Sequence, residues 1–166
     1  MIFFRGFAAA WCLLALCAFP ALAGEWRDVE WEGFRFSVPG EWKELSGPAQ
    51  REVGFGRVEA DGSPPRVVFG GYLHPLPLAQ DPPFADDAPP RELGRRKISG
   101  RGAVLYAMQG APEGLRMDFR ALCLEEPLAD GNFLCLMGGV VDLDWEDQGG
   151  VLERIFSSLG APLPEQ

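Results

Sequence analysis

Residues that could act as a nucleophile and its base are few in this chain. Serine hydrolysis needs a base beside the nucleophile, and His74, directly followed by Pro75, is the only histidine. No serine lies in the Gly-x-Ser-x-Gly turn that exposes the nucleophile of many hydrolases. The sequence therefore favours a structural or exposed histidine, and we assign no catalytic residue. The alternative is a hydrolytic enzyme whose site of scattered carboxylates and arginines is assembled only in three dimensions.

Metal-ligating residue types are equally sparse. One histidine and the two cysteines outside the N-terminal segment, Cys123 and Cys135, do not supply the four ligands of a zinc site. The acidic run Asp142–Asp147, with Glu153 following, resembles a calcium loop, but Asp147 stands where such a loop needs glycine. The acids are explained more simply by the start of a helix, where negative charge is favoured. We therefore expect no metal and no other cofactor.

A cluster of cations interrupts an otherwise acidic sequence. The net charge is −9, from 15 Lys and Arg against 24 Asp and Glu, which disfavours unspecific binding to nucleic acid or anionic lipid. Within positions 91–101, however, there are five basic residues: Arg91, Arg95, Arg96, Lys97 and Arg101. No aromatic residues are interleaved to stack single-stranded bases. The cluster is either a solvated edge that offsets the acidic surface or a site for an anionic ligand or partner.

The N-terminal segment has the order of a secretory signal peptide. Arg5 is followed by an apolar run and then by the small residues Ala21 and Ala23. The run is shorter than the roughly 20 residues that span a bilayer, which argues against the alternative of an uncleaved anchor. Lipidation is disfavoured because Leu16, a large residue, precedes Cys17.

We accordingly expect cleavage between Ala23 and Gly24, a single domain over residues 24–166, and a periplasmic or secreted protein without a membrane span. Mass spectrometry of the exported protein checks this expectation. The mature chain should begin at Gly24, and a chain that keeps Met1 or carries lipid on Cys17 would contradict it.

Glycine and proline, 21 and 15 in number, divide the rest of the chain into short segments. Apolar residues alternate with polar ones or form short runs between these turns, which is typical of strands. The strands are expected at 26–31, 33–39, 53–59, 66–73, 103–109, 115–125 and 133–141. Between them, residues 75–90 hold six prolines, which exclude a regular helix and predict a long surface loop.

The turn that contains Asp130-Gly131 should fold the two last strands into a hairpin. If Cys123 lies opposite Cys135, the same register places Ala121 opposite Met137 and Phe119 opposite Gly139, all on the apolar face. An oxidising compartment would then favour a disulfide. The alternative is a pair of buried free thiols.

A helix should close the chain. Asp144 can cap its start, and an apolar stripe follows at steps of three and four residues, which must lie against the sheet: Trp145, Gly149, Leu152, Phe156 and Leu159. Gly160 and Pro162 prevent its continuation.

The order of these segments resembles a known fold. A strand Phe34–Pro39 runs into Glu41-Trp42, Ile98–Gly100 precedes an apolar strand, and two long strands lead to Val151–Leu159. This pattern is similar to the PsbP-like fold, which includes PsbP, Mog and DcrB-type envelope proteins.

The resemblance implies an α+β protein, a PsbP-like α/β/α sandwich in which a central antiparallel sheet carries a C-terminal helix. Family members usually have a helix in the middle of the chain, where this sequence has its proline-rich segment. They typically act as accessory or binding proteins, so we expect an envelope protein without catalytic activity, bound to an unknown protein or small ligand. A structural subunit of an envelope complex is a further alternative. The sequence leaves the oligomeric state open, and the resemblance assigns no functional residue.

Overall fold

A computed structural model describes residues 25–45, 52–82, 89–111, 114–141 and 145–160. The predicted signal peptide, the predicted cap Asp144 and the rest of 142–144 lie outside these ranges, as does the side chain of Asp147. No helix among the described residues is long and apolar enough to cross a membrane.

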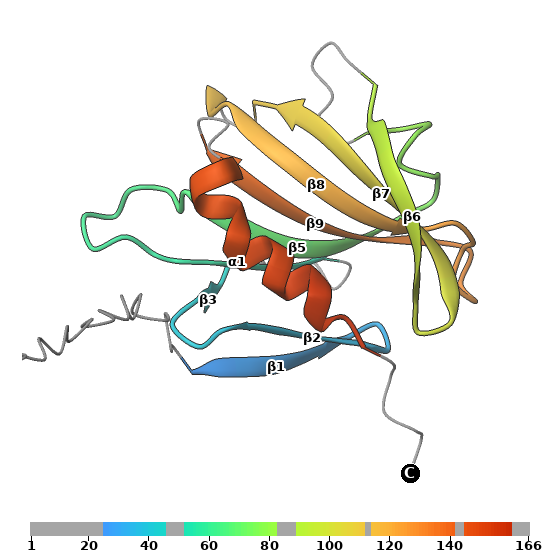
Figure 1. Ribbon diagram of the computed structural model, residues 1–166, viewed down its shortest axis with the longest axis horizontal. Coiled ribbons are helices and arrows are strands. Elements are labelled where there is room, and N and C mark those ends of the chain that lie inside the picture. Colours follow the sequence, from blue (N-terminus) through green and yellow to red (C-terminus); the bar gives the residue numbers. More distant parts are fainter. Residues whose placement is uncertain (1–24, 46–51, 83–88, 112–113, 142–144, 161–166) are drawn as a thin grey trace, which may run out of the picture.

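Seven antiparallel strands form one sheet in the order β3-β4-β5-β9-β8-β7-β6. Most of these segments were predicted as strands from the alternation of residue types. Figure 1 shows the sheet behind helix α1. The bounds are β3 Lys43–Glu44, β4 Glu52–Gly56, β5 Val67–His74, β6 Arg91–Ile98, β7 Arg101–Gly110, β8 Met117–Leu124, β9 Phe133–Val141 and α1 Trp145–Ser158.

Helix α1 lies on one face of this sheet, which we call the helix side. The predicted stripe faces the strands, with Leu152 fully buried and Phe156 packed edge-on against Phe69 of β5. Ile155, which the stripe did not include, is fully buried as well. A Cβ at Gly138 of β9 would stand 2.9 Å from Leu152, so a glycine there lets the helix approach closely. The expected α+β fold with a C-terminal helix on an antiparallel sheet is confirmed.

A separate hairpin of β1 Trp26–Trp31 and β2 Phe34–Pro39 completes the helix side. Phe36 of β2 is fully buried and contacts the rings of Phe55 and Phe69. The hairpin is also held by the end of α1, where the backbone N–H of Ser37 donates to Ser158 Oγ at 2.8 Å.

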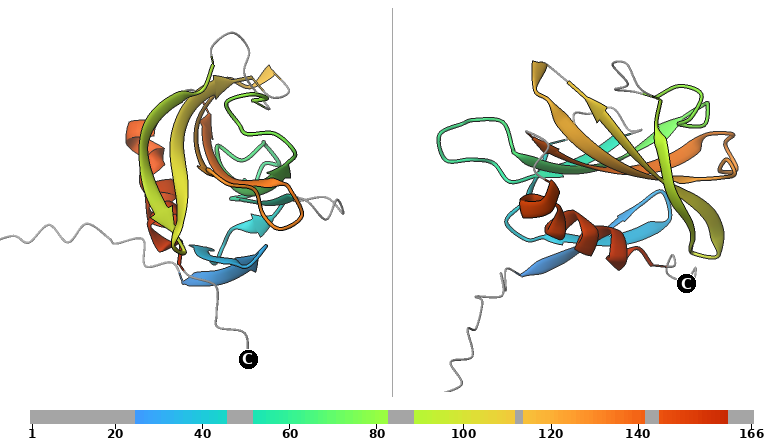
Figure 2. Two further views of the ribbon diagram at one scale, coloured as in Figure 1. Left: turned by 90° about the vertical axis from the view of Figure 1, so that its right-hand side faces the viewer. Right: turned by 45° about the horizontal axis from the view of Figure 1, so that its top comes forward.

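The opposite face, which we call the disulfide side, carries a second apolar cluster. Its buried members are Leu78, Met108, Met117, Phe119, Ala121, Cys123, Cys135 and Val141. Leu78 reaches them from the segment 75–82 that follows β5, and Figure 2 shows this segment and α1 on opposite sides of the curved sheet. Within the described residues, this irregular segment stands where an α/β/α sandwich has its second helical layer.

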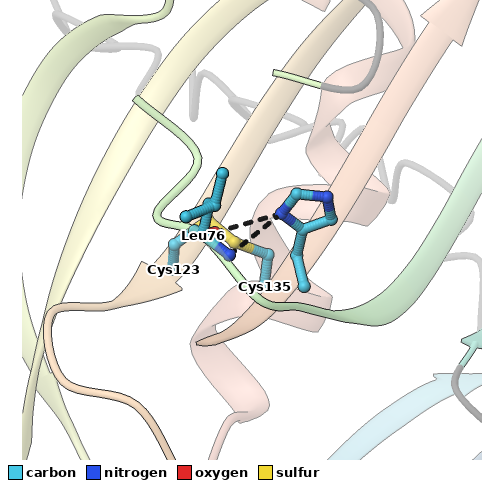
Figure 3. The surroundings of a disulfide bond; sticks show 4 residues. Leu76, Cys123 and Cys135 are labelled. Carbon is cyan, nitrogen blue, oxygen red and sulfur yellow. Dashed lines mark hydrogen bonds between the residues drawn. A yellow bond between two sulfur atoms is a disulfide. The ribbon is translucent and has the colours of Figure 1, made fainter. Parts of the chain in front are cut away.

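The hairpin of β8 and β9 has the predicted register. Cys123 pairs with Cys135, Ala121 with Met137 and Phe119 with Gly139. The two sulfur atoms are bonded, and the cysteine Cα atoms are 4.1 Å apart. Figure 3 shows Leu76 in the surroundings of this bond. Leu76 belongs to the segment 75–82, which we call the covering segment.

Candidate binding site on the basic edge strand

Strand β6 is an edge of the seven-stranded sheet and consists mainly of exposed residues. Sequence analysis did not predict it as a strand, because its cations hide any apolar alternation. The five cations for which the sequence left two interpretations, a solvated edge or an anionic binding site, lie on β6 and on the first residue of β7, and we call them the basic edge: Arg91, Arg95, Arg96, Lys97 and Arg101. Four of them belong to the edge strand itself.

Arg95 is bound by two carboxylates. Its Nε donates to Glu92 Oε1 at 2.8 Å, and its Nη1 donates to Glu125 Oε1 at 2.6 Å. The hydrogen bond from Arg95 lowers the pKa of the Glu92 carboxyl group. The pKa of the guanidinium is raised in turn, by Glu92 first and by Glu125 second. This cation is therefore neutralised locally and offers little free charge to a ligand.

Two further cations of the basic edge serve the fold. Arg96 reaches the helix side and donates to the carbonyl of Phe156 at 3.1 Å, in the last turns of α1. Burial lowers the pKa of its guanidinium, in keeping with a structural place. Arg101 donates to the carbonyls of Glu126 and Pro127 at 3.3 and 2.8 Å. Together these bonds fix β6 and the β6–β7 turn to the helix and to the β8–β9 loop.

Arg91 and Lys97 are the remaining cations. Neither forms a hydrogen bond or ion pair within the described part of the chain. Lys97 pairs with Gly102, whereas Arg91 pairs with Ala107, which in turn lies opposite Arg120 of β8 on the helix side. The structure thus brings the five predicted residues onto one edge but divides their roles, and two of them leave their charge available.

A half-buried polar group on the helix side was not predicted. Asp118 and Arg120 alternate with apolar residues along β8, yet both side chains are less than one-fifth exposed. The Arg120 guanidinium lies over the Trp145 ring, 4.5 Å from its centroid, and 3.5 Å from Asp118 Oδ1. The same face of β8 continues into the buried Leu122 and Leu124, which was the available signal that this face meets α1.

His74 contacts the irregular segment 75–82 that follows β5. Its Nδ1 lies 3.3 Å from the backbone nitrogen of Leu76, drawn as a dashed line in Figure 3, and its Nε2 lies 3.3 Å from Asp81 Oδ2. The imidazole therefore ties the start of the covering segment to a residue near its end. Among the described residues, no three His, Cys, Asp or Glu side chains are grouped to hold a metal ion.

Comparison with known proteins identifies the fold. No family model matches the chain, and no curated protein matches it in sequence. The solution structure of cyanobacterial PsbP (CyanoP) from Synechocystis sp. PCC 6803 matches with a TM-score of 0.50 at 11% identity, covering 89% of this chain and 98% of that one. The Ran-binding protein Mog1p of Saccharomyces cerevisiae covers 84% of this chain and 96% of its own, at 9% identity and a TM-score of 0.49. LpqN of Mycobacterium tuberculosis, described as involved in cell envelope biogenesis, matches at 15% identity with a TM-score of 0.46. The match covers 84% of this chain and 91% of LpqN. The chain has the PsbP-like fold that its sequence resembled.

Proposed function

We propose that this protein is an exported, non-catalytic accessory protein that binds an anionic partner through the basic edge. The observation that carries the proposal is the state of the five cations. Arg95, Arg96 and Arg101 are engaged by the protein itself and hold β6 in place. Arg91 and Lys97 stand on the exposed strand without a partner in the described residues.

Such an arrangement suits binding because the site is organised before the partner arrives. The engaged arginines hold the strand β6 itself in place, so the strand loses little conformational freedom on association and less of the interaction energy is lost. The free cations lie in a chain whose net charge is −9. They therefore provide a local attraction on a molecule that repels most anionic surfaces, which favours selectivity.

Export is the second part of the proposal, and two features support it. The N-terminal residues follow the order of a secretory signal. A disulfide is present in the β8–β9 hairpin, and such bonds persist mainly in oxidising compartments. The fold itself does not assign a function, because one fold serves many.

A polyanion binding assay tests the proposal. The double variant Arg91→Gln/Lys97→Gln removes the two free cations, and Lys43→Gln/Arg116→Gln removes one lysine and one arginine from other exposed positions. Binding of fluorescein-labelled poly-glutamate is followed by anisotropy at low ionic strength. The affinity should fall about tenfold in the first variant, because each exposed ion pair contributes a fraction of a kcal/mol to about 1 kcal/mol of binding free energy. The control should change less than about twofold. Equal loss in both variants, or no binding by the unmodified protein, would sink the proposal.

A further inference from the structure

We propose that β6 takes up an extended acidic segment of a partner protein as an additional antiparallel strand of the sheet. The inference rests on the proposed function and specifies how the partner is held. Its basis is the direction of the main-chain groups of β6, together with the place of the free charge.

Within the described residues, the main chain of β6 presents groups without hydrogen-bond partners at Lys97 and Arg95. Gly102, which pairs with Lys97, uses its carbonyl to accept a hydrogen bond from the Glu125 N–H at 3.0 Å, away from β6. Lys97 and Gly102 are therefore a non-hydrogen-bonded pair, so the N–H and C=O of Lys97 point outward from the sheet. Because this direction alternates along a strand, Arg95 has the same orientation as Lys97, about 7 Å away.

The turn between β6 and β7 supports this assignment independently. Ser99 and Gly100 both have positive φ, 51° and 79°, as in the type I′ turn that closes two-residue hairpins. In such a turn the flanking residues, here Ile98 and Arg101, are hydrogen-bonded to each other. Counting back from Ile98 again leaves Lys97 and Arg95 with outward main-chain groups.

The length of the usable edge is limited by an irregularity. The register with β7 shifts between Glu92 and Gly94, and a bulge of this kind interrupts regular pairing. The regular part of β6 is therefore 94–98, which fits a partner segment of about five residues.

Charge selects the sequence of that segment. Residues directly opposite in an antiparallel pair share one face, so the partner residue opposite Lys97 lies beside its unpaired ammonium group on the disulfide side. An acidic residue at this position would form a favourable cross-strand pair. A second copy of this chain fits poorly, because joining two β6 edges would place like charges against each other. Cations on an edge strand also discourage unwanted pairing between sheet edges. If that were their only role, an acidic peptide would not add to β6 as a strand.

Two peptide isomers of equal charge provide the test. The probe is a ten-residue peptide of alternating Glu and Thr with blocked termini. In antiparallel pairing, the residue opposite Lys97 directs its N–H at β6 and the next residue directs it away. N-methylation of the Glu residues should therefore weaken binding at least about tenfold, because several main-chain hydrogen bonds are lost. N-methylation of the Thr residues is the matched control and should change binding less than about twofold.

Amide exchange followed by NMR gives the second readout. Saturating peptide should slow exchange of the N–H groups of Arg95 and Lys97. Equal binding of both methylated isomers without slower exchange would overturn strand addition while leaving an electrostatic site. The same conclusion would follow if poly-glutamate bound but the alternating peptide did not. Failure of both poly-glutamate and the peptide to bind would overturn the proposed function as well.

Discussion

The two sides of the seven-stranded sheet use alternate residues of the same strands, yet they are closed by different means. On the helix side, α1 and the β1–β2 hairpin bury a continuous set of aromatic and aliphatic side chains, including Phe36, Phe69 and Leu152. On the disulfide side, a short irregular segment contributes Leu78 over a cluster that contains methionines and the Cys123–Cys135 bond. The comparison teaches that one side is stabilised by packing of regular elements, and the other by a covalent link.

The largest expected effect concerns packing on the helix side. Leu152 is fully buried against Gly138, and Leu152→Ala should lower the free energy of unfolding by about 3–4 kcal/mol, through lost burial and a residual cavity. Leu78→Ala on the disulfide side is the comparison variant and should cost about 1–2 kcal/mol, because an irregular segment can settle into the space. Urea unfolding measures both. Equal costs would show that the two sides are packed alike.

The disulfide should have the next largest effect. Reduction of the native protein opens a link between residues 12 apart in sequence, which the chain-entropy estimate sets at about 3 kcal/mol or less. Urea unfolding with and without reductant should show this difference. A Cys123→Ala/Cys135→Ala variant, which has no bond to lose, should not respond to reductant. In a chain that begins at Gly24, and so lacks Cys12 and Cys17, two reactive thiols in the denatured, unreduced protein would contradict the bond.

The smallest effect is an alkaline pH dependence on the disulfide side. Burial, and then the charge of Asp81, raises the pKa of Tyr72, and its hydroxyl has no hydrogen-bond partner in the described structure. The folded state thus keeps a proton that the unfolded state releases above about pH 10, so the stability from Tyr72 is present below that pH and lost as pH rises.

Tyr72→Phe should reduce this alkaline loss and leave stability at pH 7 unchanged or slightly higher, because an unpaired buried hydroxyl is removed. Unfolding midpoints measured at pH 7 and above pH 10 check it. Tyr106, the other tyrosine, is unchanged in this variant, so any alkaline loss of stability that it causes remains in both proteins. An unchanged alkaline loss in the variant would show that Tyr72 does not cause it.

Sequence reasoning reached those parts of the fold that depend on local patterns. The turn at Asp130-Gly131 and the apolar alternation around it determine the β8–β9 register, and the stripe through Leu152 determines the buried face of α1. The cations around Arg95 obscured β6, because an edge strand has no buried alternation to detect. Nor could the sequence show that Arg96 and Arg101 would be engaged by distant carbonyls. Such roles depend on which strands become neighbours, and this is decided by the whole chain.

The attachment of the β1–β2 hairpin to α1 also determines when the protein can finish folding. Ser37 and Ser158, which join these elements, are 121 positions apart. Contacts of such separation form late, since a long loop must close before they can stabilise the structure. During synthesis from the N-terminus, the contact of the β1–β2 hairpin with α1 therefore forms only after α1 has been translated.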